Sequence, residues 1–305
     1  MTNTGKLTNQ QLTTVPVASN VAVVVITYNA ERTLDQCIRS ILSQSHPPAE
    51  IIAVDAGSTD GTLAILRSFP TLTILTSTPG FAAQRNLGAK RATSDYLLFI
   101  DSDMVLPGNL ISEALEHANY GADALVIPET FSSYGLWGAV RSYERQFYDG
   151  VEWMESARWF RRSVFETLGG YDERCCLGEE WDLDERARQS FCVQRTTSPI
   201  WCNEGRVSLL KLLNKKAYYA DISDGFSVFK RKHPIRASLV LNPRERLKLF
   251  INNRQLVYRH LFLFSAMAFL GSAEYLVSRI GPLRHVFAAN PWIRNPVDDQ
   301  QGANP

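Results

Sequence analysis

The sequence predicts an α/β protein built on a doubly wound, mostly parallel sheet and followed by a C-terminal helical appendage. Three observations support this class. Short uninterrupted apolar runs recur along the first 127 residues, as expected for strands buried on both faces. Segments with apolar residues at helical spacing separate these runs, and the connections are short. This alternation of strands and helices is typical of parallel sheets.

The elements of the sheet follow one another in order. Val21–Ile26 is a six-residue apolar run and predicts the first strand. Asn29 is a suitable N-cap for the next helix, whose apolar residues repeat as far as Leu42 before the Pro47-Pro48 pair breaks it. The further predicted strands are Ile51–Val54, Leu72–Leu75, Tyr96–Ile100 and Ala124–Ile127, and the helices between them lie at 63–69, 81–92 and 108–120.

The alternation stops after Pro128, where aromatic residues become frequent. Another helix is predicted to begin at Gly178, a strand near Ile200 ends at Glu204-Gly205, and the rest is helical and basic. We therefore divide the chain into five parts. These are a flexible tail (1–20), a first half (21–127), a second half (128–221), a basic helical region (222–297) and a second flexible tail (298–305).

The composition is ordinary for a soluble enzyme, but the charge is unevenly distributed. Hydrophobic residues make up 45% and charged residues 21%, with a net charge of +1. Between Gly205 and His260, thirteen Lys and Arg face three acids, which indicates an anionic partner such as a membrane surface or a phosphorylated substrate. The five cysteines form no C-x-x-C pair, so a reducing compartment is the simpler inference.

Two carboxylates, Asp101 and Asp103, follow the strand Tyr96–Ile100. Open parallel sheets bind ligands at the carboxyl ends of their strands, so we expect these acids in a binding crevice. Residues two apart in an extended chain point the same way, so both carboxylates could bind one cation. Oxygen ligands suit Mg²⁺ or Mn²⁺, and these ions commonly bridge a protein to a diphosphate.

Three further loops are predicted to meet at the same edge. Thr27, Tyr28 and Asn29 offer a ring for stacking on a base, with polar atoms beside it. Asp55, at the end of the second strand, can accept from a base N–H or a ribose hydroxyl. Arg85-Asn86 lies early in the next helix, where a guanidinium could reach phosphate. A base, a ribose and a metal-bound diphosphate are the parts of a nucleotide sugar.

Four stretches carry this pattern: V-V-V-I-T-Y-N, V-D-A-G-S-T-D-G-T, G-F-A-A-Q-R-N-L-G-A and L-F-I-D-S-D. Together they resemble the inverting glycosyltransferases of family 2, which have the GT-A fold. The resemblance covers roughly 21–221. It implies a nucleotide-diphosphate sugar donor, Mn²⁺ or Mg²⁺ as cofactor, and displacement at the anomeric carbon by an acceptor hydroxyl that a carboxylate deprotonates. The first half would then bind the nucleotide sugar, and the second half would carry the acceptor side.

The resemblance assigns roles to individual residues. Nucleotide contacts fall on Thr27, Tyr28 and Asp55, and the metal contacts on Asp101 and Asp103. We assign Asn29, Arg85, Asn86 and Ser102 to the same nucleotide-sugar site. The later stretch G-E-E-W-D-L resembles the acceptor-side segment, which makes Glu180 the expected general base and Glu179 the second choice.

Three positions depart from the family pattern. Ala56 stands where a second acid is frequent after the residue matching Asp55. The usual Glu-Asp pair is Glu179-Glu180, one methylene longer at the expected base, and a shift of about 1 Å can matter for rate. Cys202 replaces a frequent His before E-G, and we interpret it as a small buried residue rather than a metal ligand.

The C-terminal region predicts attachment to a membrane. E-G-R-V-S-L-L-K-L-L-N-K-K-A-Y-Y-A is similar to a subgroup that works there, which suggests a lipid-linked or cell-envelope glycan acceptor. Leu261–Ala273 is uncharged but shorter than the roughly 20 residues of a span, and Glu274 limits its extension. We expect it to lie in the interface, with an anionic membrane surface as partner and the enzyme peripheral on the inner face of the plasma membrane. No nucleic acid partner is expected.

Two other functions fit parts of the sequence. Asp101-Ser102-Asp103-Met104-Val105 matches the D-x-D motif of phosphatases of the haloacid dehalogenase type, with Asp101 as nucleophile. That motif normally follows the first strand, however, and here it follows the fourth. The second alternative is a non-catalytic nucleotide-sugar binder or scaffold on the membrane. A dinucleotide-binding oxidoreductase is disfavoured because no G-x-G-x-x-G follows the first strand.

Overall fold

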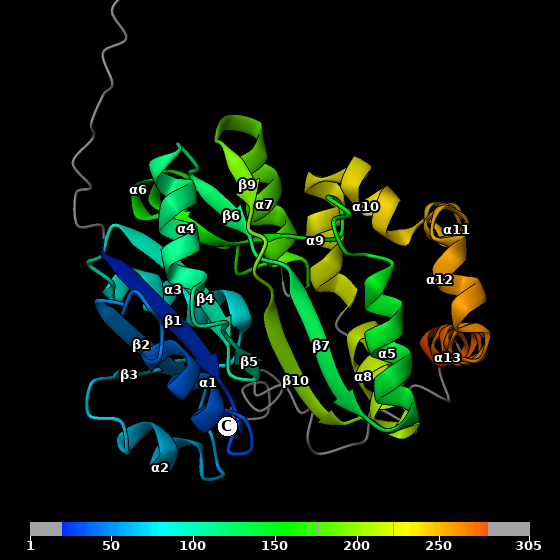
Figure 1. Cartoon of the computed structure of the whole chain (residues 1–305), viewed down its shortest axis with the longest axis horizontal. Coiled ribbons are helices and arrows are strands. Elements are labelled where there is room, and N and C mark those ends of the chain that lie inside the picture. Colours follow the sequence, from blue (N-terminus) through cyan, green and yellow to red (C-terminus); the bar gives the residue numbers. More distant parts are fainter. Residues whose placement is uncertain (1–19, 176, 222, 280–305) are drawn as a thin grey trace, which may run out of the picture.

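The computed structural model describes residues 20–175, 177–221 and 223–279. The strands of these residues lie in two sheets, and a group of C-terminal helices stands at the end of the molecule opposite β1, β2 and β3 (Figure 1). The flexible tails expected at 1–20 and 298–305 lie outside the described residues, apart from Asn20.

The larger sheet consists of β1 (Val21–Thr27), β2 (Glu50–Asp55), β3 (Thr73–Thr76), β4 (Tyr96–Asp101), β6 (Ala124–Val126), β8 (Ala157–Arg161) and β9 (Val193–Arg195). Their order is β3-β2-β1-β4-β8-β6-β9. The first four are mutually parallel, whereas β8 runs antiparallel to β4 and β6. The mostly parallel sheet predicted from the sequence is confirmed.

Helices cover both faces of this sheet, as a doubly wound fold requires. On one face lie α1 (Leu34–Leu42), α2 (Thr62–Arg67) and α4 (Leu110–Asn119), and on the other lie α3 (Phe81–Arg91), α6 (Arg162–Thr167) and α7 (Glu179–Ser190). Alternate residues of β1 feed the two cores: Val23 packs with the first group and Val24 with the second. A Cβ at Gly88 of α3 would lie 2.3 Å from Val24 Cγ1, so only glycine allows α3 to approach β1 this closely.

Asn29 is not the N-cap of the first helix, contrary to our expectation. Helix α1 begins at Leu34, with Thr33 before it. Asn29 instead adopts a left-handed conformation with φ of 49°, and its Oδ1 accepts a hydrogen bond from the backbone N–H of Thr59 at 2.8 Å. Asparagine tolerates this conformation and readily bonds to nearby backbone, so the residue shapes a turn between two loops instead of starting a helix.

A smaller sheet is formed by β5 (Met104–Val105), β10 (Ile200–Arg206) and β7 (Glu129–Tyr134), in the order β5-β10-β7. Helix α5 (Leu136–Gln146) packs against β7. Strand β10 pairs antiparallel with β5, so that Cys202 lies opposite Met104. The backbone N–H of Asn203 also donates to the carbonyl of Asp103 at 2.8 Å. This sheet therefore fixes the loop that follows β4.

Up to residue 279, where the described residues end, six helices follow β10. They are α8 (Leu209–Asp221), α9 (Ser223–Lys232), α10 (Pro234–Leu241), α11 (Pro243–Asn252), α12 (Arg254–Arg259) and α13 (Leu261–Arg279). The uncharged segment ends at Glu274, as the sequence shows, but helix α13 continues to Arg279. Glu274 is half-buried; burial raises the pKa of its carboxyl group, and the positive charges of Arg141 and Lys216 oppose this effect. By length and composition alone, α13 is the one helix of the described residues that could cross a membrane. Only 17% of its most apolar segment is buried inside the protein.

Candidate active site

The carboxyl ends of three neighbouring strands bring the predicted polar residues together. In the sheet register, Thr27 of β1 lies opposite Asp55 of β2, and Ile26 lies opposite Asp101 of β4. The side chain of Gln84, from α3, donates to the carbonyls of Thr27 (3.1 Å) and Val54 (2.9 Å) and so holds the ends of β1 and β2 together. The expected convergence of these loops at one sheet edge is therefore observed.

Asp55 is buried and shapes the loop after β2. Its Oδ2 accepts from the backbone N–H groups of Gly57 at 3.0 Å and Ser58 at 2.9 Å, and its Oδ1 accepts from the Ser58 hydroxyl. Gly57 has φ of 82°, a conformation that favours glycine. These bonds hold the carboxylate in one orientation, a useful property for a group that would recognise a base or a ribose.

The last residue of β1 and the residue after it differ in accessibility. Thr27 is buried, whereas Tyr28 is 47% exposed and therefore partly accessible to a ligand. The Thr27 hydroxyl has no hydrogen-bond partner in the described part of the chain. A buried hydroxyl without a partner normally calls for an explanation, and a bound nucleotide would supply one. The Asn29 side chain is already engaged by Thr59.

Arg85 is the centre of the site. Its guanidinium is buried, and its Nη1 donates to Glu179 Oε1 at 3.0 Å. Its Nη2 contacts both Asp101 Oδ1 at 2.9 Å and Glu180 Oε1 at 2.7 Å. Burial alone would raise the pKa of Asp101, but the positive charges of Arg85 and Arg158 outweigh this effect and lower it. Arg85 is therefore committed to carboxylates here, and its predicted contact with phosphate stays a prediction.

A second buried arginine, Arg158 on β8, was not found from the sequence. Its Nη1 lies 3.2 Å from Glu180 Oε1 and 3.5 Å from Asp101 Oδ2, and its Nη2 lies 2.6 Å from Glu129 Oε1. The only signal in the sequence was an arginine inside a strand that is otherwise buried, A-R-W-F. Two arginines thus bind four carboxylates in one cluster, which keeps a net negative charge near the sheet edge.

The two candidate bases have different surroundings. The side chain of Glu179 is 9% exposed and that of Glu180 is 25% exposed. Burial raises the pKa of Glu179 to about 7, Arg85 opposes this, and the negative charge of Glu180 adds to it. Glu179 therefore holds a proton well above the pH at which a free glutamate loses it, whereas Glu180 is the more accessible carboxylate.

Asp103 faces the opposite situation from Asp101. Burial and the negative charge of Asp101 raise the pKa of Asp103 to about 6. Asp101 has arginine partners, but no ion pair links Asp103 to a cationic side chain in the described residues. A bound divalent cation would relieve the repulsion between the two carboxylates, and carboxylate oxygens are suitable ligands for Mn²⁺ or Mg²⁺. No group of three potential ligands from His, Cys, Asp and Glu occurs in the part of the chain that the structure describes.

Three other positions singled out in the sequence are Asn86, Ser102 and Cys202, and their surroundings differ. Asn86 binds the backbone of Tyr171 from both sides, because its Nδ2 donates to the carbonyl (2.9 Å) and its Oδ1 accepts from the N–H (2.9 Å). Ser102 is half-buried between the two aspartates. Cys202 is buried, as we interpreted, and burial raises the pKa of its thiol, so it is a poor metal ligand at neutral pH.

Helix α7, which begins with the two glutamates, is held by the C-terminal helices. Asp182 is fully buried and binds Lys232 at 2.8 Å and His233 at 2.9 Å. Asp184, also fully buried, binds Arg236 at 2.6 Å. Gly178, just before the glutamates, has φ of 87°, and a Cβ there would lie 3.2 Å from the Phe229 ring. Helices α9 and α10 therefore fix the turn that presents Glu179 and Glu180.

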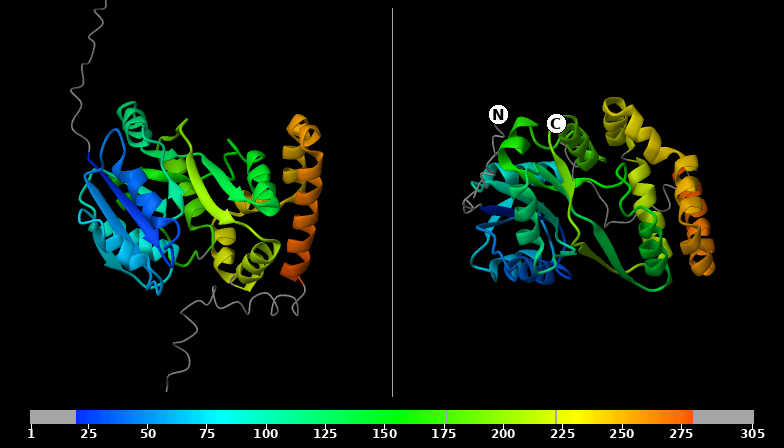
Figure 2. Two further views of the ribbon diagram at one scale, coloured as in Figure 1. Left: turned by 60° about the horizontal axis from the view of Figure 1, so that its bottom comes forward. Right: turned by 45° about the horizontal axis from the view of Figure 1, so that its top comes forward.

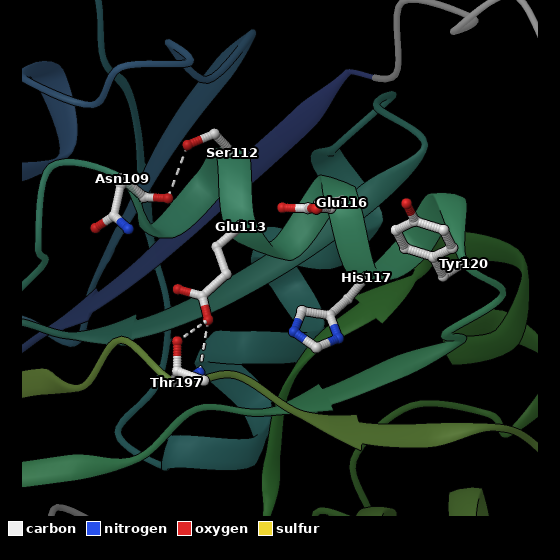
Figure 3. Close-up of a pocket in the computed structure, with 7 residues that line it drawn as sticks. All are labelled: Asn109, Ser112, Glu113, Glu116, His117, Tyr120 and Thr197. Atoms are coloured by element: carbon white, nitrogen blue, oxygen red, sulfur yellow. Dashed lines mark hydrogen bonds between the residues drawn. The ribbon is translucent and has the colours of Figure 1, made fainter.

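A surface pocket lies away from this site. It runs along α4, with the Glu113 carboxylate accepting from the backbone N–H and hydroxyl of Thr197 (Figure 3). It contains none of the predicted site residues. We therefore place the candidate active site at the sheet edge and not in this pocket.

Known proteins match part of this chain. A protein of Haemophilus influenzae named as an uncharacterized glycosyltransferase is 34% identical over 31% of this chain and 40% of its own length. TuaG of Bacillus subtilis, whose name assigns it to teichuronic acid biosynthesis, is 38% identical over 27% of this chain and 35% of its own. The chain thus spans well under two thirds of these curated relatives.

The fold also has a solved counterpart. The crystal structure of residues 1–349 of Staphylococcus aureus TarS in complex with UDP is similar, with a TM-score of 0.50 and 19% identity over 66% of this chain and 64% of that chain. Residues 22–171 match the family model for Glycosyl transferase family 2. We conclude that residues 22–171 form a glycosyl transferase family 2 domain and that the described residues have a GT-A type fold.

Proposed function

We propose that the protein transfers a sugar from a nucleotide-diphosphate sugar to an acceptor hydroxyl, with inversion at the anomeric carbon. The observation that carries this proposal is the bridge made by Arg85. One buried guanidinium contacts Asp101, at the end of a nucleotide-side strand, and both glutamates at the start of α7. It thereby fixes the donor side of the site relative to the candidate base, and such positioning accounts for much of the rate of a two-substrate reaction.

The donor would lie across the ends of β1, β2 and β4. The open ring of Tyr28 is available for stacking on the base, and the oriented carboxylate of Asp55 is available to a base N–H or ribose hydroxyl. Asp103, with Asp101, would hold the divalent cation. When bound, that ion would neutralise part of the negative charge on the departing diphosphate. Ser102 and Asn29 complete this side of the proposed site.

Glu180 is the better candidate for the general base. A base must lie within hydrogen-bond reach of the acceptor hydroxyl and be ionised at the working pH. Glu180 is more exposed than Glu179, and its carboxylate contacts both Arg85 and Arg158, which hold it in one orientation. Glu179 is buried behind it with a raised pKa, so we assign it the task of holding Arg85 in place.

The acceptor is proposed to be a lipid-linked or cell-envelope glycan, and the enzyme to work on the inner face of the plasma membrane. The name of TuaG, a relative in envelope polysaccharide synthesis, and the basic C-terminal helices support this. The match of residues 22–171 to glycosyl transferase family 2 argues against the phosphatase alternative. A non-catalytic nucleotide-sugar binder is the alternative that the following experiment addresses.

A donor screen tests the function directly. Nucleotide sugars are compared by thermal shift with and without Mn²⁺, and positive donors are then used in radiolabelled form to detect product. A bound ligand at a hundred times its Kd stabilises the fold by about 2.7 kcal/mol, which is readily measured. Binding without any product, across acceptors that include envelope lipid extracts, would support the scaffold instead.

Asp103→Asn provides the matching test of the cation site. We expect the variant to fold normally and to lose the Mn²⁺-dependent part of nucleotide binding, because its amide no longer carries the charge that attracts the ion. Asp149→Asn, at an exposed carboxylate elsewhere, is the control and should behave as the unmodified protein. Equal Mn²⁺ enhancement in both variants would contradict the assignment.

A further inference from the structure

The polarity of α13 is inverted relative to that of a helix on the surface of a soluble protein. Its exposed face carries Phe262 (70% exposed), Phe269 (58%) and Leu276, and has no charged residue between Leu261 and Leu276. The one acid of the helix, Glu274, instead lies on the inner side near Arg141 and Lys216. Surface helices normally place their charges outward and their apolar residues inward, so this face is suited to an apolar environment.

Helices α11 and α12 extend the same surface. None of their residues is buried, and their exposed side chains include Leu247, Ile251 and Tyr258. The segment 243–260 carries five Lys or Arg and a single acid, Glu245, which pairs with Lys248. Figures 1 and 2 show α11, α12 and α13 together at the outer edge of the molecule. Apolar and basic side chains are thus exposed on one group of helices.

Packing argues against α13 crossing a bilayer. Met267 and Leu270 pack with Val140 and Tyr143 of α5, and Val277 packs with Ala217 of α8. One side of the helix is therefore attached to the catalytic part along most of its length. A spanning helix would have to leave these contacts and carry Glu274 into the hydrocarbon, which is costly.

We propose that α11, α12 and α13 form a docking surface on which the protein lies in the plane of an anionic lipid bilayer. Phe262, Phe269 and Leu276 enter the headgroup boundary, and the basic residues of α11 and α12 contact anionic headgroups. This inference rests on the proposed function, because it would bring the site to a lipid-linked acceptor. The charge complementarity of the basic segment selects an anionic bilayer over a neutral one.

Flotation of the full-length protein with vesicles tests the surface. Phosphatidylcholine vesicles are compared with vesicles containing phosphatidylglycerol, at low and high salt. We expect binding to the anionic vesicles that weakens as salt rises. Phe262→Ser/Phe269→Ser should lower the partition coefficient at least roughly tenfold, since both rings leave the interface. Tyr120→Ser, at an exposed aromatic residue just after α4, should change nothing.

Two double variants test the electrostatic contribution to membrane binding. Arg254→Gln/Arg259→Gln should lower partitioning into anionic vesicles roughly 30-fold, since each basic residue near the surface contributes about a fivefold factor. Arg67→Gln/Arg91→Gln removes the same charge from exposed positions on the opposite part of the molecule and should leave binding unchanged. An equal effect of both pairs would mean general charge attraction and would overturn the assigned surface.

The remaining outcomes are equally decisive. Carbonate at high pH should release the protein from native membranes, and retention would show a spanning helix and overturn in-plane docking. Absence of vesicle binding, together with a dimer in sedimentation that the phenylalanine variant dissociates, would assign the surface to a second copy. Vesicle binding needs no catalysis, so its loss alongside normal transfer to a soluble acceptor would overturn only the docking. Docking without any transfer would count against the proposed function.

Discussion

Glu179 and Glu180 are neighbours in sequence, yet the fold gives them separate tasks. Both contact Arg85, but only Glu180 also contacts Arg158 and retains substantial exposure. Glu179 lies behind it with a pKa raised to about 7 by burial. We therefore assign different roles to two side chains of the same kind: Glu179 positions Arg85, and Glu180 is the candidate base.

Exchanging each glutamate for glutamine separates the two roles. Glu180→Gln keeps the shape but cannot accept a proton, so kcat should fall about 10²–10⁴-fold while donor affinity changes little. Glu179→Gln should have a smaller effect on kcat, since the amide still accepts a hydrogen bond from Arg85. Steady-state kinetics and donor titration measure both. A larger fall in kcat for Glu179→Gln would make Glu179 the general base instead of Glu180. Normal kcat in both variants would show that the general base is not on α7.

The site residues found from the sequence are those that follow a strand of the parallel core. Asp55 and Asp101 end two apolar runs, and that position alone predicts their place at the sheet edge. Arg158 and Glu129 were missed for a physical reason. Arg158 lies on β8, a strand that the sequence did not predict, and it reaches the site because β8 lies antiparallel beside β4. Glu129 begins β7 of the smaller sheet. A pattern of apolar residues does not specify which distant strands become neighbours.

At the scale of elements, the turn into α7 links the catalytic edge to the C-terminal helices. Gly178 has the left-handed conformation that allows the chain to enter α7 directly, and the Phe229 ring of α9 lies against it. The sequence predicted the start of this helix but not the contact, because nothing in a local pattern relates Gly178 to a phenylalanine fifty residues later.

A methyl group at Gly178 should disturb this turn in a measurable way. Gly178→Ala combines a left-handed backbone with a Cβ at 3.2 Å from Phe229, and should cost about 2–3 kcal/mol of stability and lower kcat. Gly121→Ala is the matched control, because its φ of 91° imposes the same backbone strain with no atom within 4 Å of the new Cβ. Its cost should be about 1 kcal/mol, with kcat unchanged. Equal stability losses in urea titration, with equal kcat, would show that Phe229 does not position the turn.

At the scale of the whole molecule, the raised pKa of Glu179 makes stability depend on pH. Its folded pKa of about 7 lies above its ordinary value of 4.5, so the folded chain binds more protons between these values. The contribution is fully present below about pH 4.5 and is lost as pH rises through about 7. The total is at most about 3 kcal/mol. With a chelator present, urea unfolding should show a shallower fall in stability from pH 5 to pH 8 in Glu179→Gln than in the unmodified protein. Parallel pH curves would contradict the buried state of Glu179.

The ion pairs that join α7 to α9 and α10 limit which segments can be exchanged in a chimera with a related protein. Asp182 and Asp184 find their partners Lys232, His233 and Arg236 on the far side of the boundary at residue 221 that the sequence suggested. A chimera joined at that boundary would remove these partners and leave each buried aspartate with only its arginine neighbour on α7, Arg186 or Arg188. Removing one partner of a buried ion pair is costly in a protein interior. The C-terminal helices are therefore not an exchangeable module. An exchange would have to keep α9 and α10 together with the acids of α7, and α13 together with the faces of α5 and α8 on which it packs.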